Sequence, residues 1–344
     1  MTRIDLITGF LGAGKTTWLK RYVHLLAQQG ENVCVLENDF GAVNTDVLLL
    51  KDALGNDADL ESVAGGCDAD CHRRRFKTRL ISLGMLGYDR VVIEPSGIFD
   101  PDELLDVLSE EPLDRWYTLG NIMAIVDGSR PVSQCPSDRY ILATEIADAG
   151  AVLLSHTEDA DEESLKKTVD ELNAALASVK CSRRICLYAH PREGCEPVVY
   201  AEAQTWMEEP AASAIFTCGH VISDYEKHDI ERDFSYESLC LMQPGLSAEE
   251  LSCRIRRLFS DPGCGRILRV KGFCRICEKE GADGWLQINA VPAGMEESRI
   301  AEGQDVVIVI GEELSEERIR ACLLEDMTPE TVSGEKSLEE RRDV

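Results

Sequence analysis

Near its amino terminus the chain reads Gly9-Phe10-Leu11-Gly12-Ala13-Gly14-Lys15-Thr16-Thr17. This run fits the pattern G-x-x-x-x-G-K-[ST], and it stands between the apolar run Ile4-Asp5-Leu6-Ile7 and a helical pattern that starts near Thr16. In such a loop the backbone N–H groups point at phosphate oxygens, the helix N-terminus adds its dipole, and glycine lets the backbone approach closely. The run therefore predicts a phosphate-binding loop between a buried strand and a helix.

Residues of this loop are expected to bind a nucleotide together with a magnesium ion. Lys15 reaches the β- and γ-phosphates and neutralises the transferred phosphoryl group, and the Thr16 hydroxyl ligates Mg²⁺. The predicted nucleotide contacts in the loop are Gly9, Gly12, Ala13, Gly14, Lys15, Thr16 and Thr17.

Two further segments bring acidic residues to strand ends beside this loop. Val91-Val92-Ile93-Glu94-Pro95-Ser96-Gly97 places Glu94 at the carboxyl edge of the sheet, and Gly97 lets a backbone N–H approach the γ-phosphate. Glu37-Asn38-Asp39-Phe40-Gly41 ends another strand; Asp39 or Glu94 is expected to help hold Mg²⁺, and Glu37 to help place a metal or water. The predicted catalytic residues are therefore Lys15, Thr16, Asp39 and Glu94. No residue stands out as a water-orienting group, so slow hydrolysis is expected.

Short β-branched runs alternate with longer helical stretches from residue 3 to about 190, which is typical of parallel strands joined by crossover helices. The strands are nearly continuous in apolar residues, as expected when helices cover both faces of a sheet. The predicted fold class is α/β, a P-loop NTPase parallel sheet with helices on both faces, plus a smaller C-terminal α+β domain. The predicted strands of the first domain are Ile4–Thr8, Val33–Glu37, Val91–Glu94, Ile122–Val126, Val152–Ser155 and Ile185–Ala189.

The order of elements changes after a Pro- and Glu-bearing stretch around residues 208–212. We predict a nucleotide-binding domain over residues 1–208, a C-terminal α+β domain over 212–327, and a charged, flexible tail over 328–344. Ser247 and Glu250 predict a capping box for the first helix of the second domain. The elements predicted there are a strand near Ile215, a helix over Ser247–Phe259, strands over Ile267–Ile276, Leu286–Val291 and Val306–Ile310, and a helix over Glu316–Leu324.

Composition limits the classes of partner. The 36 Lys and Arg residues against 63 Asp and Glu give a formal net charge of −27, which repels a nucleic-acid backbone. No apolar run approaches the ~18 residues that span a bilayer, so no membrane partner is expected. The chain holds 14 cysteines but opens directly on a strand without a signal-peptide pattern. Reduced thiols and a cytoplasmic location are therefore expected.

The motifs together resemble the CobW-like family of metallochaperone GTPases, relatives of the GTPases that insert nickel into urease and hydrogenase. The similarity lies in G-F-L-G-A-G-K-T-T at 9–17, E-N-D-F-G at 37–41 and E-P-S-G at 94–97, and in R-V-K-G-F at 269–273 with the strand 306–311 of the second domain. This resemblance covers nearly the whole chain. It implies GTP hydrolysis coupled to binding a transition metal and handing it over to a client protein.

Two segments depart from the family's pattern. The resemblance implies a tight Cys-x-Cys-Cys motif after paired small residues, whereas Gly65-Gly66-Cys67-Asp68-Ala69-Asp70-Cys71-His72 keeps only Cys67 in register. The guanine-reading motif, usually Asn-Lys-x-Asp, is Ser155-His156-Thr157-Glu158 here. The resemblance implies that Ser155, His156 and Glu158 contact the base, with the Glu158 carboxylate pairing to guanine N1 and N2.

The segment from Cys67 to His72 is the predicted transition-metal site. It brings thiolates, carboxylates and an imidazole into six residues, and two thiolates with an imidazole suit Zn²⁺ or Co²⁺. We predict Cys67, Cys71 and His72 as ligands, with Glu37 beside them. The alternative is that Cys67 is a small residue of a glycine loop, that Cys71 packs against the core, and that the aspartates cap a helix starting near Asp70.

These features lead to one hypothesis with an alternative. The leading function is a GTP- and Mg²⁺-dependent metallochaperone that delivers a transition metal or metallocofactor to a client metalloprotein. The alternative is a nucleotide-gated accessory protein for a cofactor-dependent enzyme, such as a corrinoid enzyme, that carries no metal itself. A small-molecule kinase is disfavoured, because the sequence shows no recognisable acceptor lid. The sequence does not specify an oligomeric state.

Overall fold

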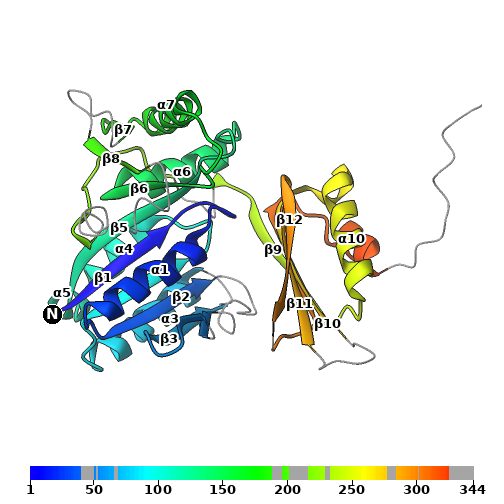
Figure 1. The fold of residues 1–344 in the computed structure, drawn as a ribbon, viewed down its shortest axis with the longest axis horizontal. Coiled ribbons are helices and arrows are strands. Elements are labelled where there is room, and N and C mark those ends of the chain that lie inside the picture. The colour runs from blue at the N-terminus through cyan, green and yellow to red at the C-terminus, as the bar shows by residue number, and fades with distance from the viewer. Residues whose placement is uncertain are drawn as a thin grey trace, which may run out of the picture.

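The computed structural model describes residues 1–39, 50–51, 53–65, 69–187, 196–200, 216–228, 233–276, 284–300 and 302–324. The first domain is built on an eight-stranded sheet in the order β3-β2-β4-β1-β5-β6-β8-β7, in which neighbouring strands pair in parallel (Figure 1). Its strands are β1 (Thr2–Thr8), β2 (Val33–Asp39), β3 (Asp59–Ala64), β4 (Arg90–Pro95), β5 (Tyr117–Asp127), β6 (Ala151–Ser155), β7 (Ile185–Leu187) and β8 (Glu196–Tyr200).

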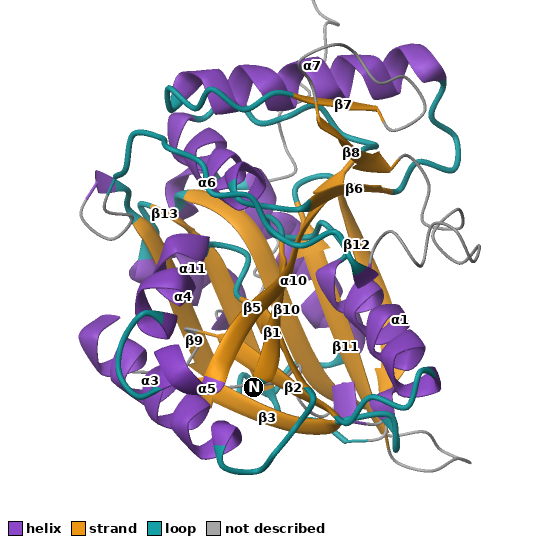
Figure 2. Cartoon of the chain, turned by 90° about the vertical axis from the view of Figure 1, so that its left-hand side faces the viewer, coloured by secondary structure: helices purple, strands orange, loops and turns teal. Residues whose placement is uncertain are grey.

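Helices cover both faces of this sheet. On one face α1 packs its buried residues against the strands, whereas α3, α6 and α7 belong to the other face. α7 lies beside β7 near one edge of the sheet and α3 beside β3 near the opposite edge, in both views (Figure 1 and Figure 2). The helices of the domain are α1 (Lys15–Gln28), α3 (Ala69–Gly84), α4 (Pro101–Leu108), α5 (Leu113–Trp116), α6 (Pro136–Ala147) and α7 (Glu162–Ser178).

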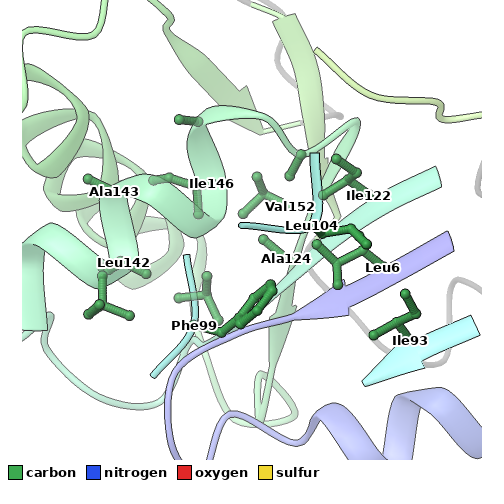
Figure 3. Packing of buried hydrophobic residues seen from close by; sticks show 14 of the residues in the cluster. Leu6, Ile93, Phe99, Leu104, Ile122, Ala124, Leu142, Ala143, Ile146 and Val152 are labelled. Atoms are coloured by element: carbon green, nitrogen blue, oxygen red, sulfur yellow. The ribbon is translucent and has the colours of Figure 1, made fainter. Parts of the chain in front are cut away.

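Successive side chains of the central strands point to opposite faces of the sheet, so the core consists of two clusters. Leu6 and Ile93 face one cluster, with Ile122 and Ala124 of β5, while Ile7 faces the other together with α1. Figure 3 shows the first cluster, where side chains of the strands meet Phe99, Leu104 and the α6 residues Leu142, Ala143 and Ile146. Because each buried strand has apolar residues on both faces, its sequence is a continuous apolar run. The predicted α/β class is confirmed.

The second domain is an antiparallel sheet with helices on one face. Its strand order is β12-β11-β10-β13-β9. Val270 and Ile288 face the core formed with α10 and α11, whereas Phe273 and Ile308 point to the opposite face, which is turned toward the first domain (Figure 1). The elements are β9 (Tyr236–Met242), α10 (Ala248–Ser260), the 3₁₀ turn η2 (Pro262–Cys264), β10 (Arg266–Ile276), β11 (Gly284–Val291), β12 (Gly294–Ile300), β13 (Val306–Glu312) and α11 (Glu316–Leu324).

Each strand and helix that the sequence predicts within the described residues is present, and the capping box of Ser247 and Glu250 is formed. The sequence reasoning missed β3, β8, β9 and β12. Ile215, the predicted boundaries at 208 and 212, and the predicted tail 328–344 lie outside the described residues. Residues 216–228 contact the first domain, where the Ile122 N–H donates to Gly219 O at 2.9 Å. In the described part of the chain, no helix has the length and apolarity needed to cross a membrane.

Candidate nucleotide and metal site

The phosphate-binding loop joins β1 to α1 with a backbone that requires glycine. Gly9 has φ 147°, and a Cβ atom there would lie 2.3 Å from the carbonyl oxygen of Ile125 on β5. Gly12 and Gly14 also have positive φ, 81° and 92°. Gly14 occupies the N-cap of α1 and offers no side-chain cap, so the amino-terminal N–H groups of the helix are directed at the loop interior. This geometry is that of an anion site.

Lys15 and Thr16 lie in the first turn of α1, directly after the loop. The Lys15 side chain is buried, and its Nζ donates to Gly9 O at 2.6 Å. Burial lowers the pKa of Lys15 to about 8, although Glu94 and Glu145 act to raise it. The Thr16 hydroxyl donates to Glu94 Oε1 at 2.6 Å. The structure thus brings Thr16 and Glu94, from α1 and β4, to one point beside the loop.

Glu94 has a second carboxylate beside it. Glu37 of β2 is its register partner in the parallel ladder, and both side chains are buried and line the same cavity. The N–H of Ser96 donates to Asn38 O at 2.8 Å, which ties the segment after β4 to the end of β2. Asp39 ends β2, but its side chain lies outside the described residues, so its predicted role stays a prediction.

Gly97 brings the backbone after β4 against the phosphate-binding loop. A Cβ atom at Gly97 would lie 2.6 Å from Leu11 Cδ2 and 2.8 Å from the Leu11 backbone nitrogen. Only glycine therefore fits this approach, and Gly97 lines the cavity together with Gly12 and Gly14. The predicted contact of its N–H with a γ-phosphate is compatible with this position.

The segment predicted to read the base follows β6. The Ser155 hydroxyl donates to Ala13 O at 2.7 Å, which fixes the end of β6 to the phosphate-binding loop. His156 has φ 54° and lines the cavity, and its Nδ1 lies 3.5 Å from Asp127 Oδ1. Glu158 is exposed. Ser155 thus positions the loop, whereas His156 is the member of this segment that faces the cavity.

The predicted metal segment divides into described and undescribed parts. Cys67 lies outside the described residues, and Cys71 is half-buried in the first turn of α3. His72 is buried; its Nε2 is 2.8 Å from Asn38 Oδ1 and its Nδ1 is 3.0 Å from Gly65 O. His72 therefore fixes the start of α3 to the end of β2. Metal binding by Cys67, Cys71, His72 and Glu37 stays a prediction.

Other acidic and thiol groups come together elsewhere. Among the described residues, two sets have ligand atoms within 4.8 Å of one another: Asp261 with Cys264 and Cys322, and Cys135 with Asp138 and Glu312. In each set a carboxylate already pairs with an arginine. Arg318 binds Asp261, and Arg266 bridges Asp138 and Glu312. Both sets are outside the nucleotide site.

A cavity of about 640 Å³ joins these features, and both domains line it. The sequence reasoning missed Lys20 and Arg130 in the first domain, and Arg269 and Lys271 of β10 in the second. The sequence does contain a signal for Arg269 and Lys271, because two cations that are two residues apart in a strand lie on the same face of the sheet. The polar and charged lining residues are Lys15, Thr16, Thr17, Lys20, Glu37, Asn38, Glu94, Ser96, Arg130, His156, Arg269, Lys271, Gln287, Asn289, Glu296 and Ser298.

Comparison with known proteins finds a family that matches the first domain, and several relatives. Residues 3–184 match the family described as CobW/HypB/UreG, nucleotide-binding domain. Zinc chaperone YjiA of Escherichia coli (strain K12) is 32% identical over 180 residues, which cover 50% of this chain and 54% of that protein. Zinc chaperone YeiR of the same organism is 33% identical over 167 residues, which cover 48% and 49%. The chain thus spans about half the length of the curated relatives it matches.

A similarity to solved structures extends over more of the chain. The crystal structure of Zn(II)-bound YjiA GTPase from E. coli is 23% identical, with 93% of this chain and 97% of that chain covered and a TM-score of 0.37. A signal recognition particle receptor FtsY from Elizabethkingia anophelis in complex with GDP matches half of this chain, with 13% identity and a TM-score of 0.35.

Proposed function

This chain belongs to the CobW/HypB/UreG family of nucleotide-binding domains, and we propose that it is a GTP-binding and GTP-hydrolysing metallochaperone. In this proposal the nucleotide state controls the binding of a transition metal, of the zinc or cobalt class, and its delivery to a client protein. The names of the similar proteins support zinc first. They include zinc chaperones and, at 28% identity over 163 residues, the zinc-regulated GTPase metalloprotein activator 1 of Schizosaccharomyces pombe.

The main structural support is a direct connection between the phosphate site and the Cys-His segment. Asn38 accepts a backbone hydrogen bond from Ser96, whose segment lines the phosphate cavity, and its side chain meets His72 Nε2 at 2.8 Å. His72 follows Cys71 at the start of α3. A displacement of the Ser96 segment by a γ-phosphate therefore has a short path to the predicted metal ligands, which is what coupling between two sites requires.

Mg²⁺ is implied by the nucleotide site, and the residues present fit it. Thr16 and Glu94 converge to 2.6 Å, and Glu37 lines the same cavity, so the donors are oxygens of the kind that a hard cation prefers. Thr16 and Glu94 would hold the ion, with Asp39 or Glu37 in addition. When bound, Mg²⁺ supplies positive charge that offsets the charge of the β- and γ-phosphates.

The chain's own residues account for binding and slow turnover. The Lys15 ammonium and the N–H groups at the start of α1 bind phosphate oxygens, and the Gly97 backbone closes on the γ-phosphate. Positioning of this kind stabilises the charge of the transferred group. The sequence singles out no water-orienting side chain, and slow hydrolysis suits a timing device.

GTP preference follows from the segment after β6. Ser155 fixes this segment to Ala13 O, which places His156 at the cavity, and Glu158 supplies the exposed carboxylate for guanine N1 and N2. Adenine offers an acceptor at N1 and would meet this carboxylate unfavourably. GTP should therefore displace bound GTP analogues far better than ATP does.

The metal part of the proposal is tested with Cys67→Ser and Cys71→Ser, singly and combined. Protein purified without oxygen is expected to hold zinc or cobalt in a GTP-dependent manner by elemental analysis, and the double variant to lose it. The matched control is Cys253→Ser, since Cys253 is exposed on α10 of the other domain. Unchanged metal content and unchanged metal-stimulated hydrolysis in the double variant would contradict metal carriage.

That contradictory result would favour the alternative, an accessory protein that is gated by nucleotide and carries no metal. One observation agrees with it: His72 uses both ring nitrogens in contacts with Asn38 and Gly65 inside the domain. GTP-versus-ATP competition in the same preparations tests the nucleotide half separately. Equal competition by ATP would overturn the assignment of residues 155–158.

A further inference from the structure

The cavity beside the phosphate-binding loop has a second wall, which belongs to the C-terminal domain. Its sheet lies between the first domain and α10, with the face opposite the helices turned toward the nucleotide site (Figure 1). The two domains touch at the loop itself, because a Cβ atom at Gly12 would lie 3.3 Å from Val291 Cγ1 of β11. Polar residues of β10 and β11 therefore line the same cavity as Lys15.

Strand alternation places two cations on this wall. Arg269 and Lys271 lie on one face of β10, whereas Val270 between them is buried against the helices. Arg269 Nε donates to Asn289 Oδ1 at 2.8 Å, which fixes the plane of the guanidinium. Lys271 is buried. Both side chains line the cavity beside the phosphate-binding loop.

The charges of this cavity differ from those of the chain as a whole. Lys15, Lys20, Arg130, Arg269 and Lys271 line it, against three carboxylates, in a chain of formal net charge −27. Burial lowers the pKa of Lys15, and the charges of Arg269 and Lys271 lower it further, so cations of the two domains act on one another. A polyanion between them would relieve this repulsion.

We propose that the C-terminal sheet is part of the nucleotide site, and that Arg269 and Lys271 contact the terminal phosphate of a bound nucleoside triphosphate. This inference rests on the proposed function, since it requires the nucleotide to occupy the phosphate-binding loop. A guanidinium binds phosphate oxygens through two parallel N–H bonds, and an ammonium adds a point charge. A diphosphate lacks the group that reaches the second wall. The triphosphate therefore holds the two domains together and its hydrolysis releases them.

The test compares Arg269→Gln with Arg275→Gln. Both residues lie on the same face of β10, but Arg275 is exposed and is not a lining residue of the cavity. Glutamine at 269 keeps an N–H donor for Asn289 at the place of Nε, and it removes the charge together with the two terminal NH₂ groups of the guanidinium. Affinities for GDP and for a non-hydrolysable GTP analogue are measured by titration calorimetry in the full chain. We expect R269Q to weaken the analogue about tenfold or more and GDP less than about twofold, and R275Q to change neither.

The outcomes separate this inference from the function on which it rests. If the unmodified protein binds neither nucleotide, the proposed function fails. If the unmodified protein binds GDP and the GTP analogue, and R269Q keeps both affinities or loses both equally, only the proposed role of the C-terminal sheet is disproved. The GDP affinity of R269Q also reports that the first domain is folded. Should R269Q not fold, Lys271→Gln is measured in the same way, and an unchanged preference for the analogue would again refute the inference.

Discussion

Lys15 and Glu145 form a buried pair beneath the phosphate-binding loop. Glu145 of α6 is fully buried and accepts a hydrogen bond from the Thr8 hydroxyl at 3.3 Å. Burial raises the pKa of this carboxyl to about 8, against the opposing charge of Lys15. The pKa of Lys15 is itself lowered by burial to about 8, and the Glu145 charge acts to raise it. The charge of Lys15 therefore depends on a residue that does not line the cavity.

This pair predicts a pH dependence of nucleotide affinity. A bound phosphate favours protonated Lys15, so the pKa of Lys15 is higher in the complex than in the free protein. The affinity for nucleotide is then fully present below the pKa that Lys15 has in the free protein. It is lost as the pH rises through that pKa, about 8, by up to about tenfold per pH unit. Titration calorimetry with GDP between about pH 7 and pH 9.5 checks this expectation.

Glu145→Gln provides the directional control. Removing the carboxylate removes a charge that raises the pKa of Lys15, so the loss of affinity should begin at lower pH than in the unmodified protein. A GDP affinity that stays constant to about pH 9.5, or a loss that moves to higher pH in E145Q, contradicts the assigned roles.

At the scale of elements, α10 offers a test of local stability. The Ser247 hydroxyl accepts from the Glu250 N–H at 3.3 Å, and Glu250 Oε2 accepts from the Ser247 N–H at 2.9 Å. Ser247→Ala should destabilise the helix by about 1 kcal/mol. Hydrogen exchange should then show about fivefold lower protection of the α10 amides, because local opening follows the same free energy.

The matched control is Ser260→Ala at the other end of the same helix. The Ser260 hydroxyl donates to Arg256 O, one of the last carbonyls, and caps no orphan N–H group. Its loss should change the protection of α10 less than about twofold. Equal effects of the two substitutions would show that the capping box does not stabilise α10.

Most of the strands that the sequence did not predict lie at the edges of the sheets. β1, β4 and β5 are central, carry apolar residues on both faces, and contain short, nearly continuous apolar runs. Three of the four missed strands, β3, β9 and β12, are at sheet edges, whereas β8 lies between β6 and β7, and the remaining edge strand, β7, was predicted. An edge strand has one neighbour and more exposed positions; β12, with the sequence GMEESRI, is exposed at most of its residues. Its pairing depends on β11, which local composition does not encode.

The residues of the candidate site also fall into a group that the sequence predicted and a group that it did not. The loop at 9–17, Glu94 and Gly97 belong to local motifs, and the parallel sheet brings their strand ends to one edge. Arg269 and Lys271 reach that cavity only because two domains dock, and Glu145 reaches Lys15 only because α6 packs across the sheet. Contacts of this kind depend on tertiary packing. The link from Asn38 to His72 was likewise unpredictable, since 34 residues separate the two side chains.

At the scale of the whole molecule, one arginine joins the domains. Arg266 of β10 donates from Nη1 and Nη2 to Asp138 of α6 at 2.9 and 2.8 Å, and from Nε to Glu312 at 2.8 Å. Asp138 is buried and also accepts from the Tyr236 hydroxyl at 2.9 Å. Burial opposes its ionisation, but the bonds from Arg266 outweigh this and hold the pKa of Asp138 below its ordinary value. This bidentate pair holds the second wall against the nucleotide site.

Arg266→Ala should therefore separate the domains without unfolding either one. It leaves the buried Asp138 carboxylate without its guanidinium, at a cost of about 2 kcal/mol or more. Small-angle X-ray scattering of the nucleotide-free protein should show a larger radius of gyration in R266A. Arg139→Ala, which removes a half-buried arginine that is next to Asp138 and bonds Gln134, should leave it unchanged. Because Arg269 and Lys271 move with the sheet, R266A should also weaken binding of a GTP analogue relative to GDP. A variant with unchanged dimensions and unchanged preference would show that Arg266 does not position the second domain.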